Sequence, residues 1–236
     1  MNLLLLQPEE IAADGLVHLT GRRHVHAREV LRVQRGQLLR VGVRGGLCGS
    51  GEVLHHDAER LELRVTLTEP PLERPGIDAV VAIPRPKALK RVLSALASLG
   101  VDRVALVNAA KVEKSYFDSK VLDPAFIAGL LDLGLEQARD TVPPVVTVHQ
   151  RFKPFVEDEL PSWPASRRLV PHPGAPIARA PVPSRERVTV AIGPDGGWVP
   201  FELECFVQQG FTPVSLGARV LRVEVAIPAV IGRVRG

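Results

Sequence analysis

The sequence contains few cysteines and no long apolar run, and both shortages narrow the classes of protein to which it can belong. Its two cysteines, Cys48 and Cys205, are far apart in the chain and give no disulfide framework, so a reduced cytosol is the expected setting. The apolar run at residues 3–6 is too short for the core of a secretion signal, and it lacks a basic flank and a cleavage site. No stretch approaches the roughly 20 apolar residues of a membrane span. We therefore expect a cytoplasmic protein that makes no contact with a membrane.

The patterns of several common functional sites are also missing. None of the 7 histidines lies in a ligand spacing with cysteine or carboxylate that defines a zinc site, so no metal is predicted. The sequence has no GxxxxGK[ST] phosphate loop, and the glycine-rich run at residues 45–51 is not followed by a helical pattern. Neither cysteine has an identifiable base nearby in the sequence, which favours structural thiols over nucleophiles.

A linker is predicted at residues 68–78, which contain three prolines and a glycine, and it divides the 236 residues into two modest domains, 1–72 and 73–236. The first domain is predicted to be rich in β-strands, with a short helix at residues 22–33 and frequent glycines that suit the tight corners of a small barrel. Strands are predicted at residues 37–43, 51–54 and 61–67.

The second domain alternates strand and helix patterns, which indicates an α/β fold with a largely parallel sheet. Strands are predicted at residues 79–83, 101–107, 145–148, 188–192 and 212–216, and helices at 87–99, 124–138 and 200–209. Residues 150–187 are rich in proline and are predicted to be irregular. A loop of this length in a compact domain is usually functional or a linker.

Positive charge is concentrated near the N-terminus. Residues 22–44 contain seven arginines against a single acid, Glu29, whereas residues 52–69 are mainly acidic. An arginine-dense surface suits a nucleic-acid backbone, because guanidinium groups make bidentate, charge-assisted contacts with phosphate. The alternative is a solvated face that pairs with the nearby acids. On the first interpretation, the candidate phosphate ligands are Arg22, Arg23, Arg28, Arg32 and Arg35.

Two glycine-containing loops follow neighbouring predicted strands in the last quarter of the chain. The first strand, Val188–Ile192, leads into the sequence GPDGG at residues 193–197, and the second, residues 212–216, ends at Gly217 and is followed by two arginines. Ligand sites of α/β sheets lie at the carboxyl ends of strands, where such loops gather. Taken alone, GPDGG is equally compatible with a tight turn between a strand and a helix.

The pattern IGPDGGW…E…GF…VSLGARVLRVEVA, which contains both glycine loops in order, resembles the C-terminal signature of the RsmE family. These are the uridine N3-methyltransferases of small-subunit ribosomal RNA, and they belong to the SPOUT class. The run HAREVLR at residues 26–32, followed by Gly36, resembles the PUA-like RNA-binding barrel at the N-terminus of the same family. The family usually has Thr-Glu-Thr after the second arginine, where this chain has Val223, Glu224 and Val225.

The resemblance implies a PUA-like β-barrel at residues 1–72 and a SPOUT α/β domain with a deep trefoil knot at residues 73–236. It implies a homodimer that binds small-subunit ribosomal RNA, adds His26 to the RNA-binding set, and makes S-adenosyl-L-methionine the cofactor. The residues expected to bind the cofactor are His172, Pro173, Ile192, Gly193, Gly196, Gly197, Leu216, Gly217 and Leu221.

For the reaction that the resemblance implies, the candidate catalytic residues are Arg219, Arg222 and Glu224. The two guanidinium groups stay protonated, so we expect them to stabilise negative charge on the uracil oxygens. Glu224 is the nearest carboxylate and the candidate base, with the alternative that it only orients an arginine.

Two questions stay open in the sequence. Lys111 and Lys114, in a loop with adjacent aromatics, are candidates for gripping RNA, although a solvated loop has the same pattern. The replacement of both threonines by Val223 and Val225 also leaves room for a catalytically silent RNA-binding or ribosome-associated protein with the same fold.

Overall fold

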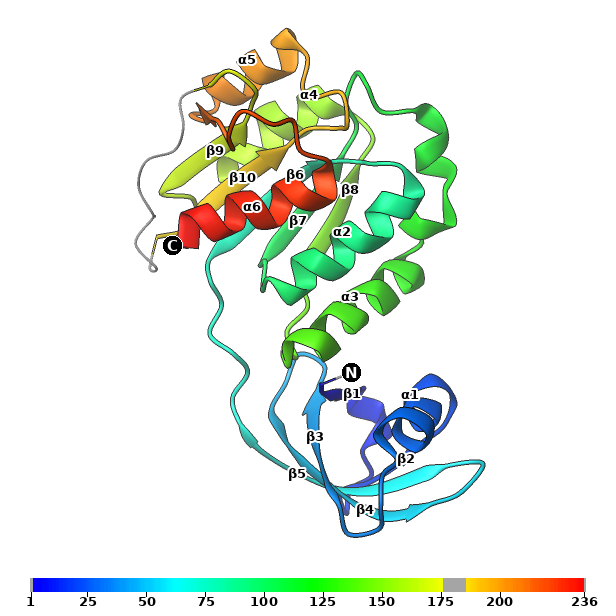
Figure 1. Ribbon diagram of the computed structural model, residues 1–236. Helices are drawn as coiled ribbons and strands as arrows, with labels where there is room; N and C mark the ends of the chain where they lie inside the picture. The colour runs from blue at the N-terminus through cyan, green and yellow to red at the C-terminus, as the bar shows by residue number, and fades with distance from the viewer. Residues whose placement is uncertain (1, 176–185, 236) are drawn as a thin grey trace. The chain divides into compact units, whose positions relative to one another are not determined.

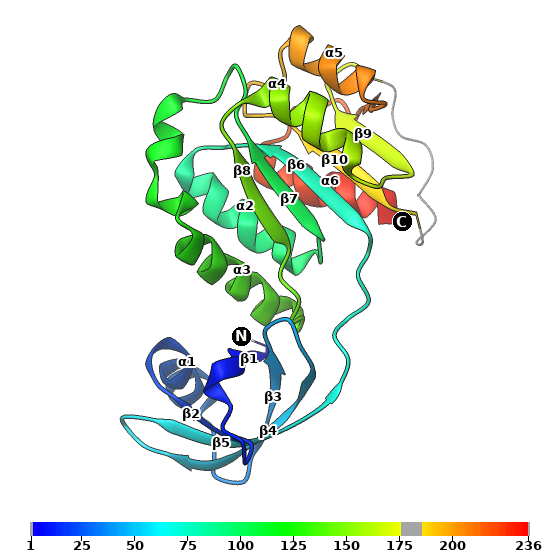
Figure 2. The ribbon, with the colours of Figure 1, turned by 180° about the vertical axis from the view of Figure 1, so that it is seen from behind.

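The computed structural model describes residues 2–175 and 186–235 of the chain (Figures 1 and 2). The chain forms two compact units. One consists of Met1–Glu73 together with Asp132–Pro143, and the other of Arg74–Leu131 with Pro144–Gly236.

The first unit contains a five-stranded sheet in the order β1-β3-β4-β5-β2. Strand β1 runs parallel to β3, and the other pairs are antiparallel. The inward-facing leucines and valines of these strands form one core, which also includes Ala27 and Val33. The strands are β1 (Leu4–Leu6), β2 (Leu16–Leu19), β3 (Leu38–Val43), β4 (Cys48–His56) and β5 (Leu61–Glu69). The helix α1 (Gly21–His26) continues into a π-helical turn at Ala27–Leu31, and a short 3₁₀ helix lies at Pro8–Glu10.

The segment Asp132–Pro143 is tied to the rest of this unit by polar contacts. Arg22 donates two hydrogen bonds, at 2.8 and 3.0 Å, to the carboxylate of Glu136, which is only 2% exposed. Arg44 pairs with Asp132 at 2.8 Å, and the Thr141 hydroxyl donates to a backbone carbonyl at 2.6 Å. A buried carboxylate needs such a partner, so Arg22 has a structural task.

The second unit is built on a six-stranded parallel sheet in the order β11-β9-β10-β6-β7-β8. Its central strands β6, β7 and β10 are almost fully buried, as expected for a parallel sheet covered on both faces. The strands are β6 (Ile77–Ala82), β7 (Arg103–Val107), β8 (Val145–His149), β9 (Arg167–Pro171), β10 (Val188–Ile192) and β11 (Thr212–Val214).

Helices cover the two faces of this sheet (Figures 1 and 2). α2 (Pro86–Ser98) and α6 (Val223–Arg235) pack together on one face, and α4 (Phe152–Pro154) and α5 (Pro200–Gln208) lie on the other. An aromatic cluster joins the second pair, with Phe206 5.4 Å from Phe152 and 4.8 Å from Trp198 between ring centroids. The remaining helices are α3 (Pro124–Ala138) and short 3₁₀ or π segments at Lys114–Asp118, Lys120–Leu122, Phe155–Glu159 and Leu160–Ser162.

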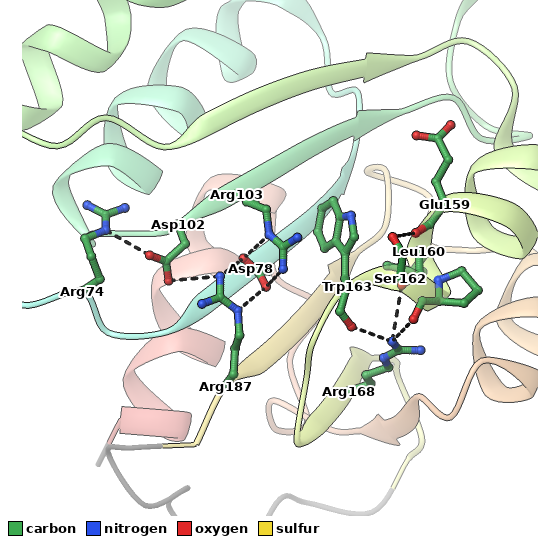
Figure 3. Close-up of polar contacts among 11 residues, drawn as sticks. Arg74, Asp78, Asp102, Arg103, Glu159, Leu160, Ser162, Trp163, Arg168 and Arg187 are labelled. Atoms are coloured by element: carbon green, nitrogen blue, oxygen red, sulfur yellow. Dashed lines mark hydrogen bonds and ion pairs between the residues drawn. The ribbon is translucent and has the colours of Figure 1, made fainter. Parts of the chain in front are cut away.

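A network of arginines and aspartates closes the amino end of the sheet (Figure 3). The fully buried carboxylate of Asp78, on β6, accepts two hydrogen bonds from Arg103 and two from Arg187, all between 2.8 and 3.0 Å. Asp102 pairs with Arg74 at 3.1 Å. These contacts join the starts of β6, β7 and β10 at the edge opposite the carboxyl ends of the strands.

The predicted alternation of strands and helices in the second unit is confirmed, but the stretch 150–187 is not simply irregular. It contains β9 and the short helices between Phe152 and Ser162, whereas residues 176–185 of the prediction lie outside the described residues. β9 was missed because prolines flank it on both sides and hide a short buried strand. Helix α6 was not predicted either, because β-branched residues and an internal Pro228 weaken its helical pattern. No helix in the described ranges is long and apolar enough to cross a membrane.

Candidate active site

A cavity of about 690 Å³ lies at the carboxyl end of the parallel sheet, in the second unit. Its walls come from the residues that follow β9, β10 and β11, from the first turn of α6, and from Lys111 in the loop after β7. This is the edge of an α/β sheet at which ligands bind, and the volume is in the range of small-molecule sites. The lining residues are Lys111, 171–174, 192–198, 215–221, Val223 and Ala226.

The structure brings together all nine residues predicted to bind a cofactor, because each of them lines this cavity. Arg219, one of the three predicted catalytic residues, also lines it. Arg222 and Glu224 lie close by in the chain but are not among the lining residues in the described part of the protein. Lys111, predicted to contact RNA, is a cavity residue, whereas Lys114 is not.

The first glycine loop is a tight turn held from several sides. The amide of Gly197 donates to the carbonyl of Pro194 at 2.7 Å, and Gly197 has a φ of 69°, a conformation that favours glycine. The indole of Trp198 is buried and donates to the Ala191 carbonyl at 3.4 Å. Both carboxylate oxygens of buried Glu202, in the first turn of α5, accept backbone amides.

The second glycine loop follows β11 and is fixed by a serine and an arginine. The Ser215 hydroxyl accepts the Gly217 amide at 3.1 Å, and Gly217 has a φ of 124°. Arg233, in the last turn of α6, donates to the carbonyls of Ser215 and Leu216 at 3.0 and 3.2 Å. The end of β9 is joined to β11 by the His172 amide, which donates to the Val214 carbonyl at 2.9 Å. Contacts within the protein itself therefore fix the geometry of this loop.

The predicted catalytic side chains differ in their surroundings. Arg219 and Arg222 are exposed, and both side chains are accessible to a large substrate. Glu224 forms an ion pair with Arg91 of α2 at 2.9 Å. Its own backbone amide and, next, Arg91 lower the pKa of Glu224, so the carboxylate stays ionised at neutral pH. Val223 is buried against the cavity, where its side chain offers no hydroxyl.

The arginine face of the first unit is less uniform than the sequence pattern indicates. Arg22 is occupied by Glu136, and Arg23 is paired with Glu10. Arg28 donates to Glu29 and to the Ala58 carbonyl at 2.9 and 3.1 Å. In contrast, Arg32 and Arg35 are exposed. The face thus contains arginines that stabilise the fold beside others that are turned to solvent.

His26, the last residue of α1, is partly buried. Its Nε2 is enclosed and has no hydrogen-bond partner among the residues that the structure describes. Burial lowers the pKa of His26, which favours the neutral ring at pH 7. A neutral imidazole can donate one N–H to a phosphate but offers it no opposite charge. Within the described ranges, no group of three or more His, Cys, Asp or Glu side chains could hold a metal ion.

Three residues that organise the cavity were not predicted from the sequence: Glu202, Arg233 and Arg91. Glu202 has a recognisable signal, an acid in the first turn of a helix that begins with proline. Arg233 and Arg91 have none, because their contacts lie 17 and 133 positions away in the chain.

Comparisons with known proteins agree with this geometry. The chain is 29% identical to Ribosomal RNA small subunit methyltransferase E of Treponema pallidum, over 96% of this chain and 87% of that protein. It is 26% identical to the protein of the same name from Synechocystis, over 93% of this chain and 72% of the relative. These relatives confirm the resemblance to the RsmE family that the glycine-loop pattern predicted.

The fold is that of a solved relative. The crystal structure of a Ribosomal RNA small subunit methyltransferase E from Neisseria gonorrhoeae, bound to S-adenosyl methionine, has a TM-score of 0.73 and 21% identity to this chain. The match covers 98% of this chain and 95% of that one. A family described as RNA methyltransferase domain matches residues 71–235. Because that match spans well over half of the sequence, this chain belongs to the RNA methyltransferase domain family.

Proposed function

We propose that this protein is an S-adenosylmethionine-dependent methyltransferase that modifies N3 of a uridine in small-subunit (16S) ribosomal RNA. The observation that carries the proposal is that nine residues chosen from the sequence as cofactor ligands all line one cavity of about 690 Å³. The relatives named for methylation of small-subunit ribosomal RNA support the class of substrate. A ribosomal RNA substrate supports the further proposal that the protein acts in the cytoplasm.

The cavity fits the cofactor in size and in chemistry. Its walls combine apolar side chains such as Ile192, Leu216 and Leu221 with the backbone of two glycine loops. Apolar walls can enclose an adenine, while backbone amides and carbonyls of the loops can bind its edge and the ribose hydroxyls. Bound S-adenosylmethionine supplies an electrophilic methyl group on a sulfonium centre. The residues of the loops would hold the cofactor, and positioning of donor and acceptor is the main demand of a displacement reaction.

The acceptor nitrogen of uridine must lose a proton, so negative charge develops on the uracil oxygens. Arg219 lines the cavity and can neutralise that charge, and exposed Arg222 can do so from the cavity rim or bind a neighbouring phosphate. Glu224 is the candidate base. Its pairing with Arg91 and its lowered pKa support the other role, in which it orients the start of α6.

The family resemblance extends the proposal to architecture. We propose that residues 1–72 form a PUA-like RNA-binding barrel and that residues 73–236 form a knotted SPOUT domain. The strand order supports a knot: the chain passes from β10 beyond β9 to form β11, and α6 then returns to pack against β10 and α2. We also propose a homodimer, in which a second subunit adjoins the cavity. For RNA, Arg32, Arg35 and Lys114 are the strongest candidates, because their side chains are exposed.

Calorimetry with S-adenosylhomocysteine tests the cofactor, and mapping of modified uridines in ribosomal RNA tests the substrate. We expect saturable binding at micromolar to millimolar ligand, and a uridine whose N3 methylation disappears when the gene is deleted. An absence of binding at millimolar ligand contradicts the methyltransferase assignment. Light scattering at micromolar protein tests the dimer, and a monomer contradicts it.

One observation favours a second candidate, a catalytically silent RNA-binding or ribosome-associated protein. Val223 lines the cavity at a position where the RsmE pattern has threonine, so one hydroxyl of the expected pocket is absent. This candidate predicts RNA binding without transfer of label from radioactive S-adenosylmethionine. Val223→Thr restores that hydroxyl, and this variant transfers the labelled methyl group only if the other residues of the site support the reaction.

A further inference from the structure

Lys111 and Glu202 hold the first glycine loop from outside the loop itself. The Lys111 Nζ donates to the carbonyl of Gly196 at 2.5 Å, across 85 positions of sequence. Glu202 Oε1 accepts the amide of Ala110, the residue before Lys111, at 2.6 Å, and its Oε2 accepts the amide of Val199 at 3.0 Å. One carboxylate therefore joins the loop after β7 to the chain that leaves the glycine loop.

The burial of these groups distinguishes their contributions. Glu202 is 3% exposed, and the two amides that its carboxylate accepts stabilise the buried group and are in turn fixed in place. Lys111 is exposed as a residue, but its stem lies against the loop, and a Cβ built on Gly196 would be only 2.7 Å from the Lys111 Cδ. A side chain at position 196 would therefore collide with the lysine stem, and glycine leaves the space that the stem occupies.

A third contact to the loop is weaker. Arg85, which precedes α2, lies 3.8 Å from Asp195 in the turn, and both side chains are about half exposed. An exposed pair at this distance contributes little. The two contacts made through Ala110 and Lys111 are the ones that can fix the turn.

We propose that Lys111 is a positioning residue of the cofactor cavity: with Glu202 it clamps the Pro194–Asp195–Gly196–Gly197 turn in the conformation that accepts the ligand. This differs from the RNA contact predicted for Lys111 from the sequence. The identity of the ligand rests on the proposed function, whereas the clamp itself is a property of the free protein. The contact between Lys111 and the Gly196 carbonyl is made within the protein, so the turn is ordered without the ligand bearing that entropic cost.

Lys111→Met removes the donor and keeps the apolar stem, and Lys114→Met is the matched control, because it removes a lysine three positions along the same loop outside the cavity. Two measurements are made without RNA: calorimetry with S-adenosylhomocysteine, and hydrogen exchange of a peptide that covers residues 193–198. We expect Lys111→Met to weaken binding roughly ten-fold and to accelerate exchange of the Gly197 amide. Lys111→Arg, which keeps a cationic donor, should retain most of the wild-type affinity and most of the protection of the Gly197 amide. Lys114→Met should equal wild type in both measurements.

Thermal unfolding separates the clamp from general stability, and the Tm of Lys111→Met should equal that of wild type because the lysine is on the surface. If Lys111→Met equals wild type in affinity for S-adenosylhomocysteine and in exchange of the Gly197 amide, the proposal that Lys111 clamps the turn is wrong. If wild-type protein does not bind S-adenosylhomocysteine, the proposed function fails, and the exchange comparison still decides whether the clamp exists. Glu202→Gln should accelerate exchange at both Ala110 and Val199, and slow exchange at both sites in that variant contradicts the proposal.

Discussion

Arg91 Nη2 lies 2.9 Å from Glu224 Oε1, and this ion pair joins α2 to the first turn of α6 beside the cavity. The Glu224 side chain is 17% exposed and that of Arg91 is 60% exposed, so the pair is partly screened by water. The backbone amide of Glu224 and then the Arg91 guanidinium lower the pKa of the carboxylate. A carboxylate that is held ionised in this way is a weak proton acceptor and a good anchor for a helix start.

We expect Glu224→Gln to lower kcat by a similar factor at every pH from 6 to 9, because the anchor is lost while no titrating base is removed. Arg91→Gln should give a similar loss, since it breaks the same pair. A pH–rate profile in which Glu224→Gln loses a limb that wild type and Arg91→Gln retain would show instead that Glu224 is the base.

The same pair has a stability signature. The folded pKa of Glu224 is below its unfolded value, so the carboxylate stabilises the fold above the unfolded pKa and loses this effect as pH falls through the folded pKa. The difference in Tm between wild type and Glu224→Gln should therefore be largest near neutral pH and shrink in acid.

Arg219→Ala tests the charge-stabilising role at the cavity wall. The guanidinium is exposed and lines the cavity, where it can meet the uracil oxygens as they gain charge. Loss of one such donor typically costs about 10²–10³ in kcat, and we expect a loss of that size. Affinity for S-adenosylhomocysteine should change by less than about two-fold, because the contact strengthens only in the transition state. Arg219→Lys keeps the positive charge but loses the planar, forked donors of the guanidinium, so its kcat should lie between those of wild type and Arg219→Ala. A large loss of cofactor affinity in Arg219→Ala contradicts this role.

The arginine face gives a prediction that separates RNA binding from folding. Arg32 and Arg35 are exposed, whereas Arg22 neutralises the buried Glu136. We expect Arg32→Gln with Arg35→Gln to weaken RNA binding for all sequences and to reduce the slope of log K against log salt by about one to two, with an unchanged Tm. Arg22→Gln should instead lower the Tm, because it leaves a buried carboxylate unpaired. An unchanged salt slope in the double variant means that these two arginines are only solvated surface.

The sequence predicted the residues of the cavity better than the contacts that shape it. Gly193, Gly196 and Gly217 are visible as signals because the chain must turn sharply after a buried strand, and strand ends in a parallel sheet meet at one edge. Glycine spacing is a local property, and so is the helical period of α2, whose predicted bounds of 87–99 differ by one residue at each end from those of the structure.

Long-range contacts are not encoded in local patterns. The seven arginines at residues 22–44 form one dense run in the sequence, but the fold places Glu136 against Arg22 and Glu10 against Arg23. These partners lie 114 and 13 positions away in the chain, and the charge pattern alone does not show which guanidinium groups the fold brings against an acid. Lys111 shows the same limit, because its contact with Gly196 depends on β7 and β10 both ending at the same edge of the sheet.

Asp78 provides a final prediction, far from the chemistry and at the opposite edge of the sheet. Its side chain is fully buried and bridges Arg103 and Arg187. The hydrogen bonds with Asp78 raise the pKa of Arg187. Asp78→Asn keeps the shape but leaves two guanidinium groups facing a neutral amide, and removal of one partner of a buried ion pair typically costs about 3–5 kcal/mol. For a chain of this size we expect the Tm to fall by roughly 10 °C in thermal unfolding.

The matched control for Asp78→Asn is Glu157→Gln, which breaks an exposed pair with Lys153 one helical turn away and should change the free energy of unfolding by less than about 0.5 kcal/mol. Because the Asp78 network lies at the amino ends of the strands and the cavity at their carboxyl ends, Asp78→Asn should leave the affinity for S-adenosylhomocysteine unchanged below its Tm. A variant that keeps the wild-type Tm would show that the arginines find water or other acceptors when the carboxylate is lost. In that case the network fixes the positions of β6, β7 and β10 without adding to their stability, because the cost of removing its charges from water offsets their mutual attraction.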